Sequence, residues 1–154
     1  MIKIEIPGRP ALSIAHVALD YNGTIAVDGK LLPSVRQRLL ALAERVRIHV
    51  LTADTYGSAR EQLRGLDVLL ETFPSADAAP RKAAIVRALG NVACLGNGFN
   101  DMEMFDASQL SIAVLGREGM CAALLSHAHV AVTCPEDGLD LLLQPDRLRA
   151  TLRT

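Results

Sequence analysis

Tryptophan is absent from this sequence, and the aromatic residues, three Phe and two Tyr, make up only 3% of it. Half of the residues are nonetheless apolar, so a core has to be built from Leu, Ile, Val and Ala. A core of this kind is typical of helices packed on a parallel sheet. Because 154 residues lie within the usual size of one domain, we expect a single domain over residues 1–154.

The sequence also lacks an excess of charge, long apolar runs and paired cysteines. A net charge of −1 gives no electrostatic reason to expect nucleic acid or an anionic membrane as a partner. No apolar run is long enough to span a membrane, and the first ten residues do not resemble a signal peptide. The number of cysteines is odd, and their spacing is not that of metal ligands: they are Cys94, Cys121 and Cys134. This favours reduced thiols in a cytoplasmic protein.

Apolar runs alternate with amphipathic segments along the chain. Ile2, Ile4 and Ile6 alternate with charged residues, the pattern of a half-exposed strand. Further strands are predicted at 14–19, 46–52, 67–72, 92–95, 111–115 and 129–133, and helices at 33–45, 57–64, 77–89, 100–107, 117–127 and after 133. Asp28-Gly29 is a hairpin signal, which predicts a small β-flap at 24–32. The alternation indicates an α/β fold: a doubly wound, mainly parallel sheet flanked by helices.

Polar residues follow three of the predicted strands directly. They are the segments Asp20-Tyr21-Asn22-Gly23-Thr24, Thr52-Ala53-Asp54 and Gly96-Asn97-Gly98-Phe99-Asn100-Asp101. Ligands of an open α/β sheet bind at the carboxyl ends of its strands, where Lys82 could also reach. Phosphoryl transfer needs a nucleophile, a divalent cation and donors to the phosphoryl oxygens. These segments contain suitable groups for all three.

Each of these residues also has an ordinary structural explanation when it is considered alone. Asp20 could be a turn residue, and Thr52 or Asp54 could cap a helix. The glycine-containing loop could be a tight turn, and Lys82 a solvated surface charge. Their occurrence in this order, at four neighbouring strand or helix ends, favours the functional interpretation.

The four segments resemble the ordered motifs of the haloacid-dehalogenase (HAD) superfamily. The first and last are most similar to the phosphorylation domain of P-type ATPases, which suggests a soluble, P-type-ATPase-like branch. The resemblance implies a Mg²⁺-dependent phosphatase in which Asp20 becomes an aspartyl-phosphate. It further implies roles for the other motif residues: phosphoryl binding by Thr52, charge stabilisation by Lys82, substrate contacts by Gly23, Thr24, Ala53 and Asp54, and metal binding by Asp20, Asn22, Asn97 and Asp101.

Two positions depart from the superfamily pattern. Asn22 stands where most of these phosphatases have an aspartic acid that transfers a proton, a loss that typically costs about 10²–10⁴-fold in rate. Asn97 stands where the usual metal-binding carboxylate would be, and its amide oxygen carries no charge. We therefore expect a slow enzyme, or one that favours leaving groups of low pKa, such as acyl, anhydride or aryl phosphates. A non-catalytic regulatory module that binds phosphate or nucleotide remains the alternative.

The spacing of the motifs leaves no room for an inserted cap domain, because each gap is filled by a predicted helix and a strand or flap. Water exclusion must then come from the flap, from a further copy of the chain, or from a large substrate. We expect a homo-oligomer that acts on a phosphorylated small molecule or a phosphoprotein. Tyr21 and Phe99, at the variable positions of two motifs, could line the substrate crevice or pack against the flap.

Overall fold

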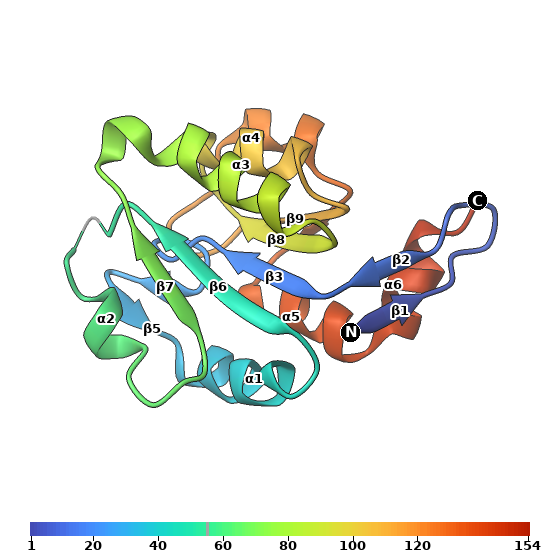
Figure 1. The fold of residues 1–154 in the computed structure, drawn as a ribbon, viewed down its shortest axis with the longest axis horizontal. Helices are drawn as coiled ribbons and strands as arrows, with labels where there is room; N and C mark the ends of the chain where they lie inside the picture. The colour runs from blue at the N-terminus through green and yellow to red at the C-terminus, as the bar shows by residue number, and fades with distance from the viewer. Residues whose placement is uncertain (55) are drawn as a thin grey trace.

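The computed structural model describes residues 1–54 and 56–154. A six-stranded sheet lies at its centre, with the order β10-β9-β8-β3-β6-β7 and parallel pairing throughout (Figure 1). Its strands are His16–Leu19 (β3), Arg47–Thr52 (β6), Leu69–Thr72 (β7), Val92–Gly96 (β8), Leu110–Val114 (β9) and Val130–Val132 (β10).

Helices cover both faces of this sheet. On one face lie Pro33–Ala43 (α1) and Pro135–Leu143 (α5), with Pro145–Leu152 (α6) beside them (Figure 1). The other face is covered by Ala78–Leu89 (α3) and Met102–Asp106 (α4). Shorter helical segments are Ala59–Gln62 (α2) and the 3₁₀ turns Ser75–Asp77 (η1), Phe99–Asp101 (η2) and Ala122–His127 (η3).

The buried residues form two clusters, one on each face of the sheet. In β3, Val17 and Leu19 belong to the cluster under α1 and α5, whereas Ala18 belongs to the cluster under α3 and α4. Since neighbouring residues of a strand point to opposite faces, a strand covered on both sides is apolar at every position. This explains the uninterrupted apolar runs in the sequence and confirms the predicted doubly wound, parallel sheet.

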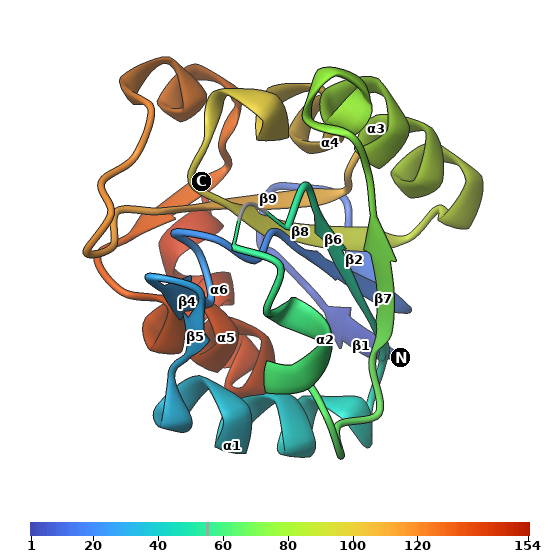
Figure 2. The ribbon, with the colours of Figure 1, turned by 90° about the vertical axis from the view of Figure 1, so that its left-hand side faces the viewer.

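Two small antiparallel pairs accompany the central sheet. Ile2–Ile4 (β1) pairs with Leu12–Ile14 (β2), and Ala26–Val27 (β4) pairs with Lys30–Leu31 (β5). The second pair is the predicted flap, which lies next to α2 (Figure 2). The run at 14–19 was predicted as one strand, but its first part pairs with β1 and only His16–Leu19 enters the central sheet.

The prediction of a helix at 117–127 is wrong over its first half. Only Ala122–His127 is helical, as a 3₁₀ segment, and Gly116 forms an isolated bridge with Gly119. Gly119 has a φ of +80°, a conformation that glycine adopts without steric cost and that ends a right-handed helix. The loop that contains Gly119 instead contacts the residue after β8: Nδ2 of Asn97 donates to the carbonyl of Gly119 at 3.1 Å, and the amide of Cys121 donates to the carbonyl of Asn97 at 2.8 Å.

The order of the strands determines where a ligand can bind. After β3 the chain adds β6 and β7 on one side, then returns to add β8, β9 and β10 on the other. The carboxyl ends of β3, β6 and β8 therefore surround the point at which the strand order reverses, where doubly wound folds bind their ligands. None of the helices in the described residues is long and apolar enough to cross a membrane.

Candidate active site

Three charged side chains meet at the carboxyl ends of β3 and β8. The ammonium of Lys82, on α3, lies 2.6 Å from Oδ1 of Asp20 and 2.9 Å from Oδ1 of Asp101. Lys82 and Asp101 have no exposed surface, and Asp20 is 6% exposed. The three groups predicted to converge from the sequence do so, and Asp20 is the member of the cluster that reaches solvent.

The ammonium and the carboxylates stabilise one another's charged forms. Burial alone would lower the pKa of Lys82, but the negative charges of Asp20 and Asp101 outweigh this effect and raise it above its ordinary value. Burial raises the pKa of Asp101, and the nearby charge of Asp20 raises it further, while Lys82 acts in the opposite direction. Removing Lys82 would therefore leave two carboxylates without their shared cation in a water-poor environment.

Asp101 is held from a second side by the backbone of its own loop. Its Oδ2 accepts hydrogen bonds from the amides of Asn97 (3.1 Å) and Gly98 (3.0 Å). A Cβ at Gly96 would lie 2.6 Å from Cγ of Asp101, so this approach requires glycine. Because both carboxylate oxygens are occupied, Asp101 is placed as a partner of Lys82, underneath the pocket rather than on its surface.

Thr24 joins the first and last motifs. Its hydroxyl lies 3.1 Å from Oδ2 of Asp20 and 3.1 Å from Oδ1 of Asn97. The amide group of Asn97 is oriented by its Nδ2, which donates to the carbonyl of Gly119 at 3.1 Å. Gly23 permits this contact, because it has a φ of +77° and a Cβ there would lie 2.3 Å from Nδ2 of Asn97.

The second motif folds into a turn at the end of β6. The hydroxyl oxygen of Thr52 accepts the amide of Asp54 at 2.8 Å, which leaves the hydroxyl proton available to a ligand. Oδ1 of Asp54 accepts the amide of Ala59, the first residue of α2, at 3.2 Å. The side chain of Asp54 therefore holds the loop together, which was its structural explanation from the sequence, and Ala53 faces the pocket.

A pocket of about 340 Å³ opens above this cluster. It is lined by Asp20, Asn22, Thr52, Ala53, Asn97, Gly98, Phe99 and Asn100. Asn22 Oδ1 is buried and, within the part of the chain that the structure describes, has no hydrogen-bond partner. The pocket thus combines one carboxylate with several neutral oxygen atoms.

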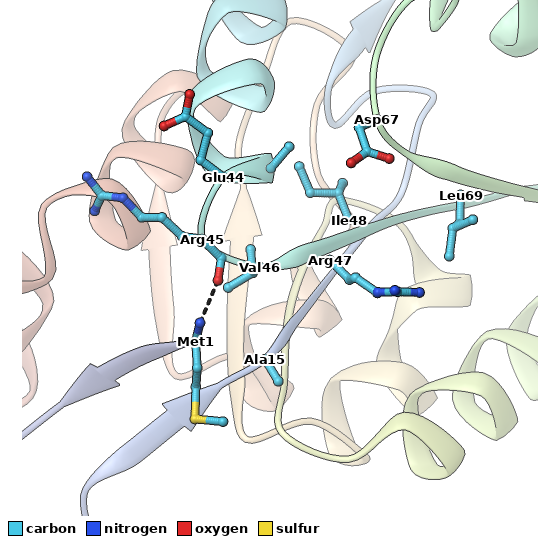
Figure 3. Close-up of a pocket in the computed structure, with 10 residues that line it drawn as sticks. Met1, Ala15, Glu44, Arg45, Val46, Arg47, Ile48, Asp67 and Leu69 are labelled. Atoms are coloured by element: carbon cyan, nitrogen blue, oxygen red, sulfur yellow. Dashed lines mark hydrogen bonds between the residues drawn. The ribbon is translucent and has the colours of Figure 1, made fainter.

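A second hollow, of about 450 Å³, lies at the opposite end of the sheet, near the starts of β3 and β6 (Figure 3). Its charged residues, such as Arg47 and Asp67, are exposed. The amino group of Met1 donates to the carbonyl of Arg45 there. No buried carboxylate or ammonium lines it, so it lacks the groups that distinguish the first pocket.

The structure also shows which neighbouring side chains stay outside the pocket. Arg81, the residue before Lys82 on α3, lies with its guanidinium 4.9 Å from the ring centre of Phe73, outside the pocket. Tyr21 is fully buried and donates to the carbonyl of Gly29 at 2.8 Å, so it packs against the flap. Burial raises the pKa of Tyr21 to about 12.

Two contributors to the site were not assigned from the sequence. Asn100 lines the pocket, and its place inside the last motif was the available signal. The carbonyl of Gly119 orients Asn97, but a backbone oxygen leaves no signal in residue type. Within the described residues, no group of three or more His, Cys, Asp or Glu side chains could hold a metal ion, so any cation there would depend on amide and backbone oxygens as well.

Comparisons with solved structures identify the fold. The chain resembles 3-deoxy-D-manno-octulosonate 8-phosphate phosphatase from Moraxella catarrhalis, solved with magnesium, phosphate and KDO, at a TM-score of 0.71 and 14% identity over 91% of this chain and 94% of that one. It resembles the cobalt-bound enzyme from Haemophilus influenzae at a TM-score of 0.72 and 14% identity, over 92% of this chain and 94% of that one. It resembles a putative HAD subfamily III A hydrolase from Legionella pneumophila at a TM-score of 0.70 and 14% identity, over 90% of this chain and 87% of that one.

Comparisons of sequence identify nearer relatives. No protein-family model matches the chain. It is 54% identical over 39 residues to uncharacterized protein MJ0072 of Methanocaldococcus jannaschii, covering 25% of this chain and 89% of that protein. It is 37% identical over 62 residues to uncharacterized protein MJ0073 of the same organism, which covers 40% of this chain and 67% of that protein. The chain therefore belongs to one family with these two archaeal proteins, and its fold is that of the capless phosphatases of the HAD superfamily.

Proposed function

We propose that the protein is a phosphohydrolase, or a phosphotransferase, in which Asp20 attacks the phosphoryl group. The observation that carries this proposal is the ammonium of Lys82, shared between Asp20 and Asp101 at 2.6 and 2.9 Å beneath the pocket. A buried cation between two carboxylates is costly to assemble, and it lies beside the one acidic side chain that lines the pocket. This is the charge distribution that an attacking carboxylate and an incoming phosphoryl group need.

The oxygen atoms at the pocket fit a divalent cation such as Mg²⁺. The hydroxyl of Thr24 has a single proton for two acceptors, Oδ2 of Asp20 and Oδ1 of Asn97, and Oδ1 of Asn22 has no partner in the described residues. These acceptor oxygens outnumber the single Thr24 proton directed at them, which favours a hard cation with oxygen ligands. Asp20, Asn22 and Asn97 would hold the ion, whose charge would neutralise the phosphoryl oxygens.

Lys82, Thr52 and Asp20 have different roles in the proposed reaction. Lys82 donates to Oδ1 of Asp20 at 2.6 Å, which fixes the orientation of the carboxylate. The hydroxyl of Thr52 is free to donate to a phosphoryl oxygen, since its own oxygen is already occupied by the amide of Asp54. Attack by Asp20 forms an aspartyl-phosphate and releases the leaving group. Water then cleaves this intermediate and restores the carboxylate.

Asn22 restricts the leaving groups that this site can expel. Its amide cannot give a proton to a departing alkoxide, and among the described residues that line the pocket Asp20 is the one acid or base. Leaving groups that are stable as anions do not need that proton. We therefore propose a preference for acyl, anhydride or aryl phosphates. The structural neighbours are 3-deoxy-D-manno-octulosonate 8-phosphate phosphatases, so this preference would set the chain apart from them.

The experiment that tests the proposal is trapping with beryllium fluoride, a mimic of the phosphorylated carboxylate, in the presence of Mg²⁺. Wild-type protein should gain thermal stability, because the mimic binds only the folded site. Asp20→Asn should gain none. Asp67→Asn, which changes a carboxylate of the other hollow, should respond like the wild type.

Hydrolysis of acetyl phosphate and of glucose 6-phosphate should then be compared. Faster turnover of acetyl phosphate, abolished in Asp20→Asn, would support both the nucleophile and the leaving-group preference. Equal rates on the two substrates would contradict the preference. An absence of trapping and of turnover would instead favour the rival function, a phosphate-binding module without catalysis, for which the neutral side chains of Asn22 and Asn97 are the arguments.

The remaining parts of the proposal concern the context of the site. We propose that residues 1–154 act as one domain, as a homo-oligomer, on a phosphorylated small molecule or a phosphoprotein. The three free cysteines are compatible with the cytoplasm. The likeness to P-type ATPases rests on two loop motifs alone and stays a prediction.

A further inference from the structure

Phe99 is the most exposed large apolar side chain among the described residues, at 74%. It is also one of only five aromatic residues in the chain. Its position is the rim of the pocket, at the start of η2, directly after the loop that holds Asp101. An aromatic ring left in water loses the favourable transfer that burial would give it, so its exposure beside the nucleophile calls for a functional explanation.

Tyr21, the other aromatic residue of the motifs, differs from Phe99 in its burial. Tyr21 is fully buried and hydrogen-bonded to the flap, so it has a structural role and no surface to offer. Phe99 lines the pocket, whereas Tyr21 lies outside it. Of the two residues at variable positions of the motifs, Tyr21 therefore lies in the core and Phe99 lies on the wall of the pocket.

The charges around the pocket restrict what could lie on Phe99. No Lys or Arg is among the residues that line the pocket, and Lys82 beneath it has no exposed surface. A leaving group with its own carboxylate or second phosphate would therefore find no basic side chain to pair with among the described residues of the lining. Phe99 and Ala53 are the apolar residues of the lining, beside the polar side chains of the motifs, and they suit a flat, uncharged group.

We propose that Phe99 is the specificity residue of the site and that it binds the aromatic leaving group of an aryl phosphate. This inference rests on the function proposed above and narrows its substrate class. Two independent features point to the same chemistry: Asn22 requires a leaving group that departs as an anion, and Phe99 favours one with a planar apolar surface. A phenol or naphthol satisfies both.

The reaction balances with water as the only co-reactant. Asp20 forms a bond to phosphorus while the bond from phosphorus to the aryl oxygen breaks, and the aryloxide leaves with the electron pair. Water then attacks the phosphorus of the aspartyl-phosphate, and the carboxylate of Asp20 is restored. One proton of that water ends on the aryloxide, so the products are a phenol and inorganic phosphate.

The test compares 1-naphthyl phosphate with acetyl phosphate, which has no ring, in wild type, Phe99→Ala and Leu125→Ala. The ratio of kcat/KM for naphthyl over acetyl phosphate should fall by about 10-fold in Phe99→Ala, the factor expected for one lost aromatic contact. It should stay at the wild-type value in Leu125→Ala, which removes an exposed apolar side chain outside the pocket. An unchanged ratio in Phe99→Ala overturns the inference.

A binding measurement separates this inference from the proposed function. In an Asp20→Asn background, calorimetry should show 1-naphthyl phosphate binding more tightly than inorganic phosphate, with most of that difference lost when Phe99→Ala is added. Equal affinities would refute the role of Phe99 even if turnover occurs. Failure of wild type to turn over acetyl phosphate would refute the proposed function and leave the binding result to stand alone. A change in oligomeric state in Phe99→Ala, with an unchanged ratio, would assign the ring to a contact between copies and also overturn the inference.

Discussion

Replacement of Lys82 by methionine should destabilise the protein strongly, because it removes the ammonium between two buried carboxylates. Met fills a similar volume, so the change isolates the charge from the packing. Lys82 lies 2.6 Å from Asp20 and 2.9 Å from Asp101, with no exposed surface. Breaking a buried ion pair from one side costs about 3–5 kcal/mol. At about 2–4 °C per kcal/mol for a chain of this size, the melting temperature should fall by about 6–20 °C.

The cost should depend on pH in a direction that can be worked out. Burial raises the pKa of Asp101 in the folded protein, and the charge of Asp20 raises it further, while Lys82 opposes both effects. In Lys82→Met this opposition is gone, so the pKa rises further. A carboxyl with a raised pKa binds more protons when folded, so its contribution to stability is lost as pH rises through the folded pKa. The difference from wild type should therefore be larger at pH 8 than at pH 5.5.

Urea unfolding of Lys82→Met at the two pH values measures this difference. Lys30→Met, an exposed lysine on the flap, serves as the control and should change the free energy of unfolding by no more than about 0.5 kcal/mol. Adding Asp101→Asn should recover part of the loss, because it removes a charge that has become unpaired. A loss below about 1 kcal/mol, or one that is the same at both pH values, would refute the electrostatic account of the site.

Three further changes test other parts of the structure. Asn22→Asp should raise the hydrolysis of glucose 6-phosphate by about 10²-fold or more, measured as phosphate release, if only the proton donor is missing. Gly96→Ala would place a Cβ 2.6 Å from Cγ of Asp101 and should cost about 1–3 kcal/mol in urea unfolding, whereas Gly98→Ala, with a nearest neighbour at 3.3 Å, should cost less. Burial lowers the pKa of His49 in the folded protein, so the unfolded chain takes up the proton first and stability should fall as pH drops below about 6.5; a His49→Gln variant with the same pH dependence would contradict this.

The convergence of Asp20, Lys82 and Asp101 could be predicted because a parallel sheet fixes the direction of its strands. Once the apolar runs are assigned to parallel strands, the residues that follow them must meet at one edge. Lys82 has a second basic residue, Arg81, beside it on the same helix. Successive residues of a helix differ by about 100° in direction, so only one of the two could face the cluster, and α3 turns Lys82 inward and Arg81 toward Phe73.

The contacts that complete the site could not be predicted in the same way. The amides of Asn97 and Gly98 donate to Asp101, and the carbonyl of Gly119 accepts from Asn97. These groups belong to the backbone of loops, whose path depends on turn geometry rather than on an apolar pattern. The misassigned helix at 117–127 belongs to this class of error, since its apolar residues lie after Gly119, whose left-handed φ keeps the residues before Ala122 out of the helix.

The neutral side chain of Asn97 is easier to understand from the charges around it. Two carboxylates and one ammonium leave the cluster of Asp20, Asp101 and Lys82 with one excess negative charge. An aspartate at position 97 would add a second, at an oxygen that shares the hydroxyl of Thr24 with Asp20, and would repel both the neighbouring carboxylate and an incoming phosphoryl dianion. An amide held by Gly119 presents an oxygen in the same place without that repulsion. The neutral amide therefore lowers the repulsion of a phosphoryl dianion at the pocket, and an Asn97→Asp variant should bind inorganic phosphate more weakly than the wild type in calorimetry.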